Sequence, residues 1–582
     1  MISLKYPDGK LQLLIFSTSV VVAPWFLIDA TVLPKFAALM ILSALLSFRM
    51  IAGKRISDGL HFSNVFIILN LSLICLIIIS LLFSNHLWLS IFGEYSRSFG
   101  AATILGLIVI SLYFSIFNSK KIEIALIKLF QITANLVSGY YVIQFFDMDV
   151  ISWEGWYGVP SSFLGNPNFV SSYAAIGLAV SAAMLLLGEN NESRILTHKK
   201  FRAERISKIA AITLHLFVVV TNGSKQGYVL IVLAGFLLLV MKMPRLSNSR
   251  RIRYVFSITS TSCLILGFYF FRNQLLQLSE VQSRWFYLDI AVRMSIDNLP
   301  FGVGFGEYPY YFREYRDVNQ ALEFGYGPNI YSDSSHNLFA DLLLGAGPLA
   351  AVVYISIFTI VIKQFFNSFR EQDSARKIFF LILICFMSQA IISPPQLSLM
   401  LWGHISLGIL AYRIKPPSKQ LVGNSRVREY QERLKRTQSS RVTNSKISKQ
   451  TLFLIPGIFV FAATAPLRTD FSFLQSFYTQ NLEIIEGKAL SFPTNSARLR
   501  YAASIMCANG EPKRAARILD FAIKQNSRDY ENIYYYLKQD LNPQKRLELS
   551  KRLQNLDPKS PDSAVGELLK LARDPDCREK GN

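Results

Sequence analysis

Long apolar runs alternate with short polar segments over most of residues 1–412. Runs of about 17 to 25 residues are long enough to cross the ~30 Å hydrocarbon core of a bilayer as helices. They lack the alternation of barrel strands, and a helix satisfies its own backbone hydrogen bonds in lipid. The spans predicted in this way are 11–28, 32–48, 63–83, 99–118, 122–146, 168–187, 208–222, 227–243, 255–271, 337–362, 378–394, 397–412 and 452–467. The pattern predicts an all-α polytopic membrane bundle of about 12 to 13 transmembrane helices with a C-terminal helical-repeat domain.

Charge sets the expected orientation of these spans. The chain carries a net charge of +22, although only 17% of its residues are charged and 51% are hydrophobic. Lys and Arg gather on alternate connections, as in 49–55, 194–205, 242–253 and 413–449, and the intervening loops carry few of them. This positive-inside pattern predicts a cytoplasmic N-terminus. It also explains the basicity as a topology signal, so we expect no nucleic-acid partner.

The chain divides into four expected parts. Residues 1–412 form the membrane domain, with a core at about 80–412, and 413–450 form a basic cytoplasmic linker. Residues 451–467 are the last span, which exits the membrane and places 468–582 outside. Within the membrane domain the outside loop 272–335 is long and aromatic, which is typical of a functional loop. Its stretch WFYLDIAVRM has the spacing of a helix lying along the membrane surface.

The tail after residue 467 has helical periodicity. A turn at Asn509-Gly510 precedes a helical pattern that stops at Asn526, and a similar pattern about 31 residues later stops at Asp557-Pro558. This form resembles degenerate tetratricopeptide repeats, whose period is about 34 residues. Such repeats often bind another protein, so the tail is a possible partner-binding region.

Polar residues on the outside face are the candidates for chemistry. His336 and Asn337 stand between the long loop and an apolar span, where an imidazole with an ordinary pKa near 6.5 suits general-base work. The alternative reading is a helix cap. Arg97 and Arg284 lie on the face that the positive-inside rule disfavours, and guanidinium groups match phosphate oxygens. The alternative there is an interfacial anchor or a local ion pair.

Two further segments favour an anion, and one suggests a metal. Asn166 and Asn168 belong to LGNPN, a tight turn that opens a helix whose free N–H groups attract negative charge. Lys225, in the turn NGSKQG, faces the same side. Asp147 and Asp149 form a spaced carboxylate pair of the kind that binds a divalent metal in many sugar transferases. The five cysteines form no CxxC pair, which gives no sign of a zinc or redox site.

The order of these motifs resembles that of a known family. FGEYSRSFG, SSFLGNPNFVSSYAA, NGSKQGYVLIVLAG, SRWFYLDIAVRMSIDNLPFGVGFGEY and SHNLFADLLLGAGPLA follow one another as in the O-antigen ligase and polymerase family, which includes pilin oligosaccharyltransferases. The resemblance covers roughly residues 80 to 415. It implies transfer of a glycan from an undecaprenyl-diphosphate carrier to an acceptor outside the bacterial inner membrane, without metal or other cofactor.

The resemblance also implies roles for individual residues. Arg97 and Arg284 would hold the diphosphate, with Lys225, Asn166 and Asn168 as further substrate-binding residues, and His336 with Asn337 would activate the acceptor. That acceptor would be lipid A core, another glycolipid or a protein. The chain departs from the family pattern at Lys225, where an arginine is usual, and at Gly345, where an acidic residue is common. An arginine expected shortly before GNPN is absent.

Other functions fit the sequence as well. A polymerase that joins repeat units would use the same motifs, with a second lipid-linked glycan as acceptor. A membrane transporter or flippase would share the many spans, although no clear internal repeat is present. A metal-dependent glycosyltransferase would use Asp147 and Asp149, and a scaffold would use the tail to recruit other proteins.

Overall fold

The computed structural model describes residues 9–52, 65–151, 158–187, 198–246, 279–324, 332–369, 372–412, 453–539, 541 and 543–559. Within these ranges the regular elements are all helices, and there is no β-strand. The helices are α1 (Gly9–Val20), α2 (Leu33–Ala52), α4 (Val65–Leu82), α5 (Leu87–Phe92), α6 (Ala101–Ile116), α7 (Lys120–Phe145), η1 (Ser162–Leu164), α8 (Pro167–Leu187), α9 (His198–Asn222), α10 (Lys225–Leu246), α12 (Ser279–Asp297), α13 (Tyr308–Tyr315), α14 (Val318–Phe324), α15 (Leu338–Asn367), α16 (Ser374–Ile392), α17 (Leu397–Ala411), α20 (Leu454–Phe477), α21 (Leu482–Ala489), α22 (Ser496–Ala508), α23 (Pro512–Gln525), α24 (Tyr530–Leu537) and α25 (Pro543–Leu556).

Eight of the described helices are long and apolar enough to cross a membrane: α2, α4, α7, α8, α10, α15, α16 and α20. Two shorter apolar helices, α6 and α17, pack against each other. Every predicted span that lies within the described residues overlaps one helix, which confirms the polytopic helical membrane fold. The predicted span 255–271 and the linker 413–450 lie outside the described residues.

The ends of two spans differ most from the sequence expectation. The first was expected over 11–28, but α1 ends at Val20. The chain then turns back, with the Ala23 amide donating to the Ala30 carbonyl at 2.8 Å. The last span was expected to end at 467, but α20 continues to Phe477 and carries Pro466 inside it. The expected domain boundary at 467 therefore falls within a helix.

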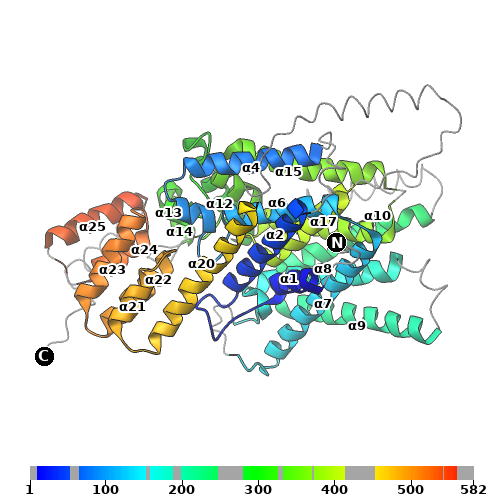
Figure 1. The fold of residues 1–582 in the computed structure, drawn as a ribbon, viewed down its shortest axis with the longest axis horizontal. Coiled ribbons are helices and arrows are strands. Elements are labelled where there is room, and N and C mark those ends of the chain that lie inside the picture. Colours follow the sequence, from blue (N-terminus) through cyan, green and yellow to red (C-terminus); the bar gives the residue numbers. More distant parts are fainter. Residues whose placement is uncertain are drawn as a thin grey trace.

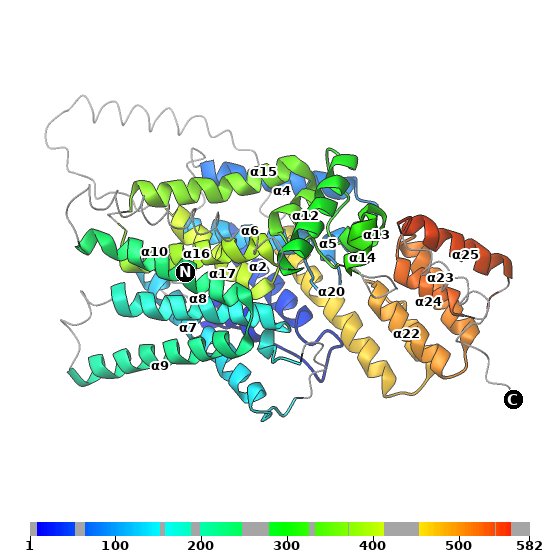
Figure 2. The ribbon, with the colours of Figure 1, turned by 180° about the vertical axis from the view of Figure 1, so that it is seen from behind.

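The molecule has three parts along its long axis. The long apolar helices lie roughly along this axis, and α21–α25 stand at one end (Figure 1). The loop helices α12, α13 and α14 lie between the two groups, as the view from behind also shows (Figure 2). α12 confirms the helix expected in the long loop. Apolar side chains of α12 and α13 form one buried cluster with the first turns of α15: Ile290, Met294, Phe312, Ala340 and Leu344.

Charged contacts join the tail to the loop helices. Arg316, which follows α13, donates to the Asp557 carboxylate after α25 at 2.7 Å, and both side chains are buried. The guanidinium of Arg313 lies 4.1 Å from the ring centroid of Tyr530 in α24. A buried ion pair is sensitive to geometry, because an unmatched charge in the interior is costly. These contacts fix the orientation of the tail against the long loop.

Candidate functional site

A cavity of about 740 Å³ lies where the membrane bundle meets the loop helices and the tail. It is within the ~300–1,000 Å³ range of ligand pockets. Seven segments that are distant in sequence supply its walls, from the start of α2 to the start of α24. Five sequence-predicted residues are among those lining it, namely Arg97, Asn166, Asn168, Arg284 and His336. Each membrane-domain wall comes from a helix end or loop that the positive-inside pattern assigns to one side of the membrane.

Arg97 is held by a tight turn between α5 and α6. The turn can close tightly because Gly100 has no β-carbon. A β-carbon at this position would overlap the backbone at Gly93. Gly93 itself has a φ of 81°, which suits glycine. The Arg97 Nε donates to the Asp333 carboxylate at 2.7 Å, and its guanidinium lies 5.6 Å from the ring centroid of Phe169. Burial alone would raise the pKa of Asp333, but the charge of Arg97 holds this pKa below its usual value.

Arg284 approaches the cavity from helix α12. Its Nε donates to the backbone carbonyl of Ile392, at the end of α16, at 3.2 Å. In the described part of the chain, no carboxylate lies within ion-pair distance of its guanidinium, and no acceptor binds its two terminal nitrogens. Burial lowers the pKa of this guanidinium, yet an arginine stays charged. Arg284 is therefore a cation whose terminal donors are open to a ligand.

His336 lies directly before α15, with a φ of 54°. Its ring stacks on Tyr287 of α12 with centroids 4.6 Å apart, and the buried Nδ1 has no hydrogen-bond partner among the described residues. Burial, followed by the charge of Arg284, lowers the pKa of this imidazole from 6.5 to about 3. The ring is therefore neutral at physiological pH. A neutral imidazole beside two arginines is able to accept a proton.

Lys35 is a cavity residue that the sequence reasoning missed. It is 1% exposed in the first turns of α2, and its Nζ donates to the carbonyls of Thr31 and Phe163 at 2.6 and 2.7 Å. An ammonium has three donors, so one remains for a ligand. No carboxylate lies within 4.0 Å of Nζ in the ranges that the structure describes. A buried amino group with an open donor favours a hydrogen-bond acceptor, such as a phosphate oxygen, in the adjoining space.

Four helix N-termini face the cavity: those of α2, α8, α15 and α17. Aligned peptide dipoles give each a partial positive charge that favours anions. Asn166 and Asn168 organise the α8 terminus, since the Asn168 amide donates to Asn166 at 2.9 Å. The Asn168 side chain accepts from the Ser224 hydroxyl at 2.8 Å, which ties α8 to the start of α10. Two sequence motifs that are 56 residues apart thus meet.

The tail also reaches the cavity. Glu531, near the start of α24, is among the residues lining it, and the Arg500 guanidinium pairs with its carboxylate at 2.6 Å. Burial raises the pKa of Glu531 to about 7. The sequence predicts that the tail lies on the extracytoplasmic side of the membrane. It does not indicate that an acidic side chain of the tail lines this cavity. Asp333 was missed for a different reason, since its role appears only when Arg97 folds against it.

Two predicted residues do not line the cavity. Asn337 is the N-cap of α15, with its side-chain oxygen accepting from the amides of Phe339 and Ala340 at 3.0 and 3.2 Å. This is the cap geometry that stabilises a helix start. Lys225 is exposed and pairs with Glu280 at 2.7 Å, outside the residues lining the cavity. Its predicted contact with substrate has no support in this geometry.

The departure at Gly345 has a packing explanation. A β-carbon there would overlap the ring of Phe305, which comes from the glycine-rich part of the long loop. An acidic side chain has no space at this position. Asp341, one turn earlier, accepts from the amide and hydroxyl of Ser335 at 2.9 and 2.7 Å. Its carboxylate therefore holds the loop that carries His336.

The carboxylate pair proposed for a metal is used for local structure. Asp149 accepts from the Tyr140 hydroxyl at 2.8 Å, from Gln144 at 3.0 Å and from the Ile151 amide at 2.9 Å. Asp147 has a φ of 54° in the turn after α7. Neither residue is among those lining the cavity. The pair therefore lies outside the constellation of Arg97, Arg284 and His336.

Comparison with protein families adds an independent observation. The family described as O-antigen ligase matches residues 210–355, which are 146 of the 582 residues. The match contains Arg284 and His336, and Arg97 lies before it. No curated protein matches the chain. The family match, together with eight membrane-capable helices in the described residues, supports a multi-pass membrane protein that transfers glycans, as enzymes of the ligase and polymerase family do.

Proposed function

We propose that this protein transfers a glycan from an undecaprenyl-diphosphate carrier to an acceptor hydroxyl on the outer face of the bacterial inner membrane. The observation that carries the proposal is the convergence of Arg97, Arg284 and His336 on one cavity from three separate segments. An anion-binding end and a neutral base are the two groups that this substitution requires. A nucleotide-binding site is not needed, because the lipid diphosphate is already an activated leaving group.

The diphosphate would bind among the two arginines of the cavity and the Lys35 amino group. As the bond between the anomeric carbon and the phosphate oxygen breaks, negative charge builds on that oxygen. Arg284 has open terminal nitrogens, Lys35 has one open donor, and Arg97 stands opposite beside Asp333. Prearranged donors at developing charge contribute several kcal/mol of transition-state stabilisation in typical enzymes. Because the chain itself supplies these cations, we propose that transfer proceeds without a metal.

His336 would act on the acceptor. The acceptor oxygen forms a bond to the anomeric carbon while its proton passes to the neutral imidazole, and undecaprenyl diphosphate leaves. Tyr287 supports the ring from one face, and Asp341 fixes the loop through Ser335. The bound diphosphate adds negative charge beside the imidazole, which raises its pKa toward the range useful for accepting a proton. A positioned base contributes about 100- to 10,000-fold in rate.

The tail supports the extracytoplasmic location of this chemistry. Cys507 in α22 is disulfide-bonded, and its partner lies outside the described residues. Disulfides persist in oxidising compartments and are rare in the cytosol. Glu531 places the tail at the cavity itself, so the tail and the chemistry share one side of the membrane. This agrees with the side that the positive-inside pattern assigns to the cavity walls.

Purified protein in proteoliposomes tests the proposal. The donor is undecaprenyl-diphosphate-linked glycan extracted from the host cell, and the readout is glycan transfer to envelope acceptor from a deletion strain. We expect the wild-type protein to transfer glycan in the presence of EDTA. In Arg284→Ala the rate of transfer should fall 100-fold or more. Arg293→Ala is the matched control, because Arg293 lies on the same helix and pairs with Asp289 at 2.6 Å outside the cavity. Equal activity of the two variants would contradict the proposal, and so would growth of lipid-linked chains without any acceptor product, which would indicate a polymerase.

A further inference from the structure

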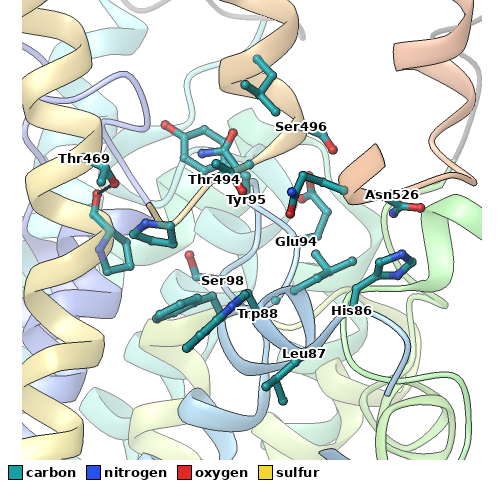
Figure 3. A pocket seen from close by; sticks show the side chains of 18 of the residues that line it. His86, Leu87, Trp88, Glu94, Tyr95, Ser98, Thr469, Thr494, Ser496 and Asn526 are labelled. Carbon is teal, nitrogen blue, oxygen red and sulfur yellow. Dashed lines mark hydrogen bonds between the residues drawn. The ribbon is translucent and has the colours of Figure 1, made fainter. Parts of the chain in front are cut away.

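A second cavity, of about 280 Å³, is lined by the turn that carries Arg97, between α5 and the tail (Figure 3). Glu94, Tyr95 and Ser98 of this turn line the second cavity, whereas Ser96 and Arg97 line the larger one. The membrane helices α2 and α20 and the short helix α5 supply one wall, and tail residues around the start of α22 and the end of α23 supply the other. The two cavities are therefore neighbours with different linings.

The smaller cavity combines aromatic faces with uncharged hydrogen-bonding groups. Trp88 is 46% exposed and stands edge-on to Phe492 of the tail, with ring centroids 4.7 Å apart. The other aromatic and uncharged polar residues lining the cavity are Phe36, Phe92, Tyr95, Tyr310, Asn85, Ser98, Thr469, Thr494, Asn495, Ser496, Gln525 and Asn526. Aromatic rings pack against the C–H faces of sugar rings, and amides and hydroxyls match their hydroxyl groups.

The charge of the lining separates this cavity from the diphosphate site. No Lys or Arg occurs among the residues that line it, all of which the structure describes. Its ionisable groups are Glu94, Tyr95, Tyr310 and His86, whose Nδ1 lies 2.6 Å from the buried Glu307 carboxylate. The hydrogen bond to Glu307 raises the pKa of His86, and the Glu307 carboxylate balances the charge of the protonated ring. Burial raises the pKa of Glu94, which favours its neutral form. Such a lining suits an uncharged ligand and disfavours a phosphate.

A buried polar atom also points to a ligand. Asn526 is 6% exposed at the C-cap of α23, and its side-chain oxygen accepts from the Arg528 amide at 2.9 Å. Its Nδ2 has no hydrogen-bond partner among the described residues. A buried donor without a partner costs about 1–3 kcal/mol, so an acceptor on a ligand would stabilise it. Asn526 and His86 lie together at one side of the cavity, with Thr469 at the opposite side (Figure 3).

We propose that the cavity between α5 and the tail binds sugar residues of a glycan substrate, with Trp88 as the stacking platform and Asn526 as a hydrogen-bond donor. The inference rests on the proposed glycan transfer and adds the site at which the protein binds and recognises the saccharide. The sugars belong either to the lipid-linked donor or to the acceptor. The tail thereby has a function in substrate recognition, because eight of the 23 residues lining this cavity come from it.

Direct binding of soluble glycans tests the inference independently of transfer. The first probe is glycan released by mild acid from the cell's undecaprenyl-linked pool, and the second is delipidated acceptor glycan from a deletion strain. Dissociation constants are measured by calorimetry on detergent-purified full-length protein. We expect one probe to bind, and the probe that binds identifies the source of the sugars.

Variants assign that binding to the smaller cavity. We expect Trp88→Ala to raise the dissociation constant tenfold or more, and Trp88→Phe to raise it less than Trp88→Ala does. Asn526→Asp retains the acceptor for the Arg528 amide but removes the donor, so we expect a several-fold rise. Arg97→Ala should leave binding of both phosphate-free probes unchanged. Size-exclusion profiles and melting temperatures matched to the wild type establish that each variant is folded.

Three results would overturn the inference. They are no binding of either probe to the wild type at millimolar concentration, unchanged binding in both Trp88→Ala and Asn526→Asp, and equal loss of binding in Arg97→Ala and Trp88→Ala. The proposed transfer would fail separately, through retained activity of Arg284→Ala. Glycan binding that depends on Trp88 in a protein without transfer activity would support the subsite alone.

Discussion

Arg97 and Asp333 form a pair whose balance determines the charge at one end of the catalytic cavity. Removing Arg97 deletes a cation and also leaves the Asp333 carboxylate beside the proposed diphosphate. Part of the loss in Arg97→Ala therefore comes from repulsion by that carboxylate. We expect Arg97→Ala to raise the KM for donor tenfold or more, and the double variant Arg97→Ala/Asp333→Asn to recover part of it. A double variant with a higher KM than Arg97→Ala would contradict this account.

His336 sets the expected pH dependence of the enzyme. Its pKa in the free protein is lowered to about 3, so the neutral, proton-accepting form is present throughout the neutral and mildly acidic range. The profile of kcat/KM reports the free enzyme and should show no acidic limb near pH 6.5. The profile of kcat reports the bound complex, in which the diphosphate raises the pKa of His336. Its acidic limb should therefore lie at higher pH than that of kcat/KM, and the reverse order would be inconsistent with a base beside the diphosphate.

The sequence predicted some cavity residues and missed others for physical reasons. Arg97, Arg284 and His336 were visible because charge on the outside face is unusual next to apolar spans. Lys35 was not predicted as a site residue, because a lysine near the end of a span is also expected from the topology pattern alone. An ordinary imidazole pKa near 6.5 was also assumed for His336, whereas burial and Arg284 lower it. Such effects depend on distances between segments, which one sequence does not contain.

The turn between α5 and α6 is the element that aims Arg97. A methyl group on Gly100 would overlap the backbone at Ile91 and Gly93, so Gly100→Ala should open the turn and displace Arg97. We expect a stability loss of roughly 1–3 kcal/mol and a higher KM for donor. Gly139→Ala in α7 is the matched control, because nothing lies within 4 Å of its added methyl group.

Thermal unfolding in detergent measures the change in stability of these glycine variants, and steady-state kinetics measures their KM for donor. Gly139→Ala should melt at the wild-type temperature or slightly above, since alanine favours a helix. A Gly100→Ala protein with wild-type melting temperature and KM would show that the turn does not depend on the close approach of Gly93 and Gly100.

The sequence predicts which segments form membrane helices, but it predicts the residues at which these helices end less well. Apolar length identifies a span because the bilayer thickness determines it. The early end of α1 depends on the fold-back of residues 21–32, where Asp29 accepts from the amides of Thr31, Val32 and Leu33. The extension of α20 depends on Asp470, whose carboxylate accepts from the Ile28 amide at 2.8 Å and from the Tyr95 hydroxyl. The Asp29 contacts are local, whereas the Asp470 contacts join segments that are far apart in the sequence.

The side of the membrane on which the tail lies is a property of the whole molecule. Lys524 in α23 has a side chain that is 73% exposed, and Lys121 is exposed at the opposite, predicted cytoplasmic end of the bundle. We expect Lys524→Cys to react with a membrane-impermeant maleimide in intact spheroplasts and Lys121→Cys to react only after lysis. Protection of Lys524→Cys until lysis would place the tail and the cavity in the cytoplasm.

The sequence described the tail as a separate helical unit, but the structure makes it part of the site. Arg316 and Asp557 join it to the long loop, and Glu531 reaches the catalytic cavity. The tetratricopeptide-like character of the tail remains a prediction, and its possible protein partner does too. The charges at this junction gave no sequence signal, because each partner pairs with a residue more than 200 positions away.

The central claim is that His336 is the base for a transfer whose donor is held by other residues. Its direct measurement is single-turnover transfer by purified His336→Ala, together with the affinity of that variant for the lipid-diphosphate donor. We expect the rate of transfer to fall at least 100-fold while the dissociation constant of the donor changes by less than about threefold, because a base acts on the acceptor proton in the transition state. A variant that keeps more than about a tenth of the wild-type rate is outside the range of general-base catalysis and would contradict the claim.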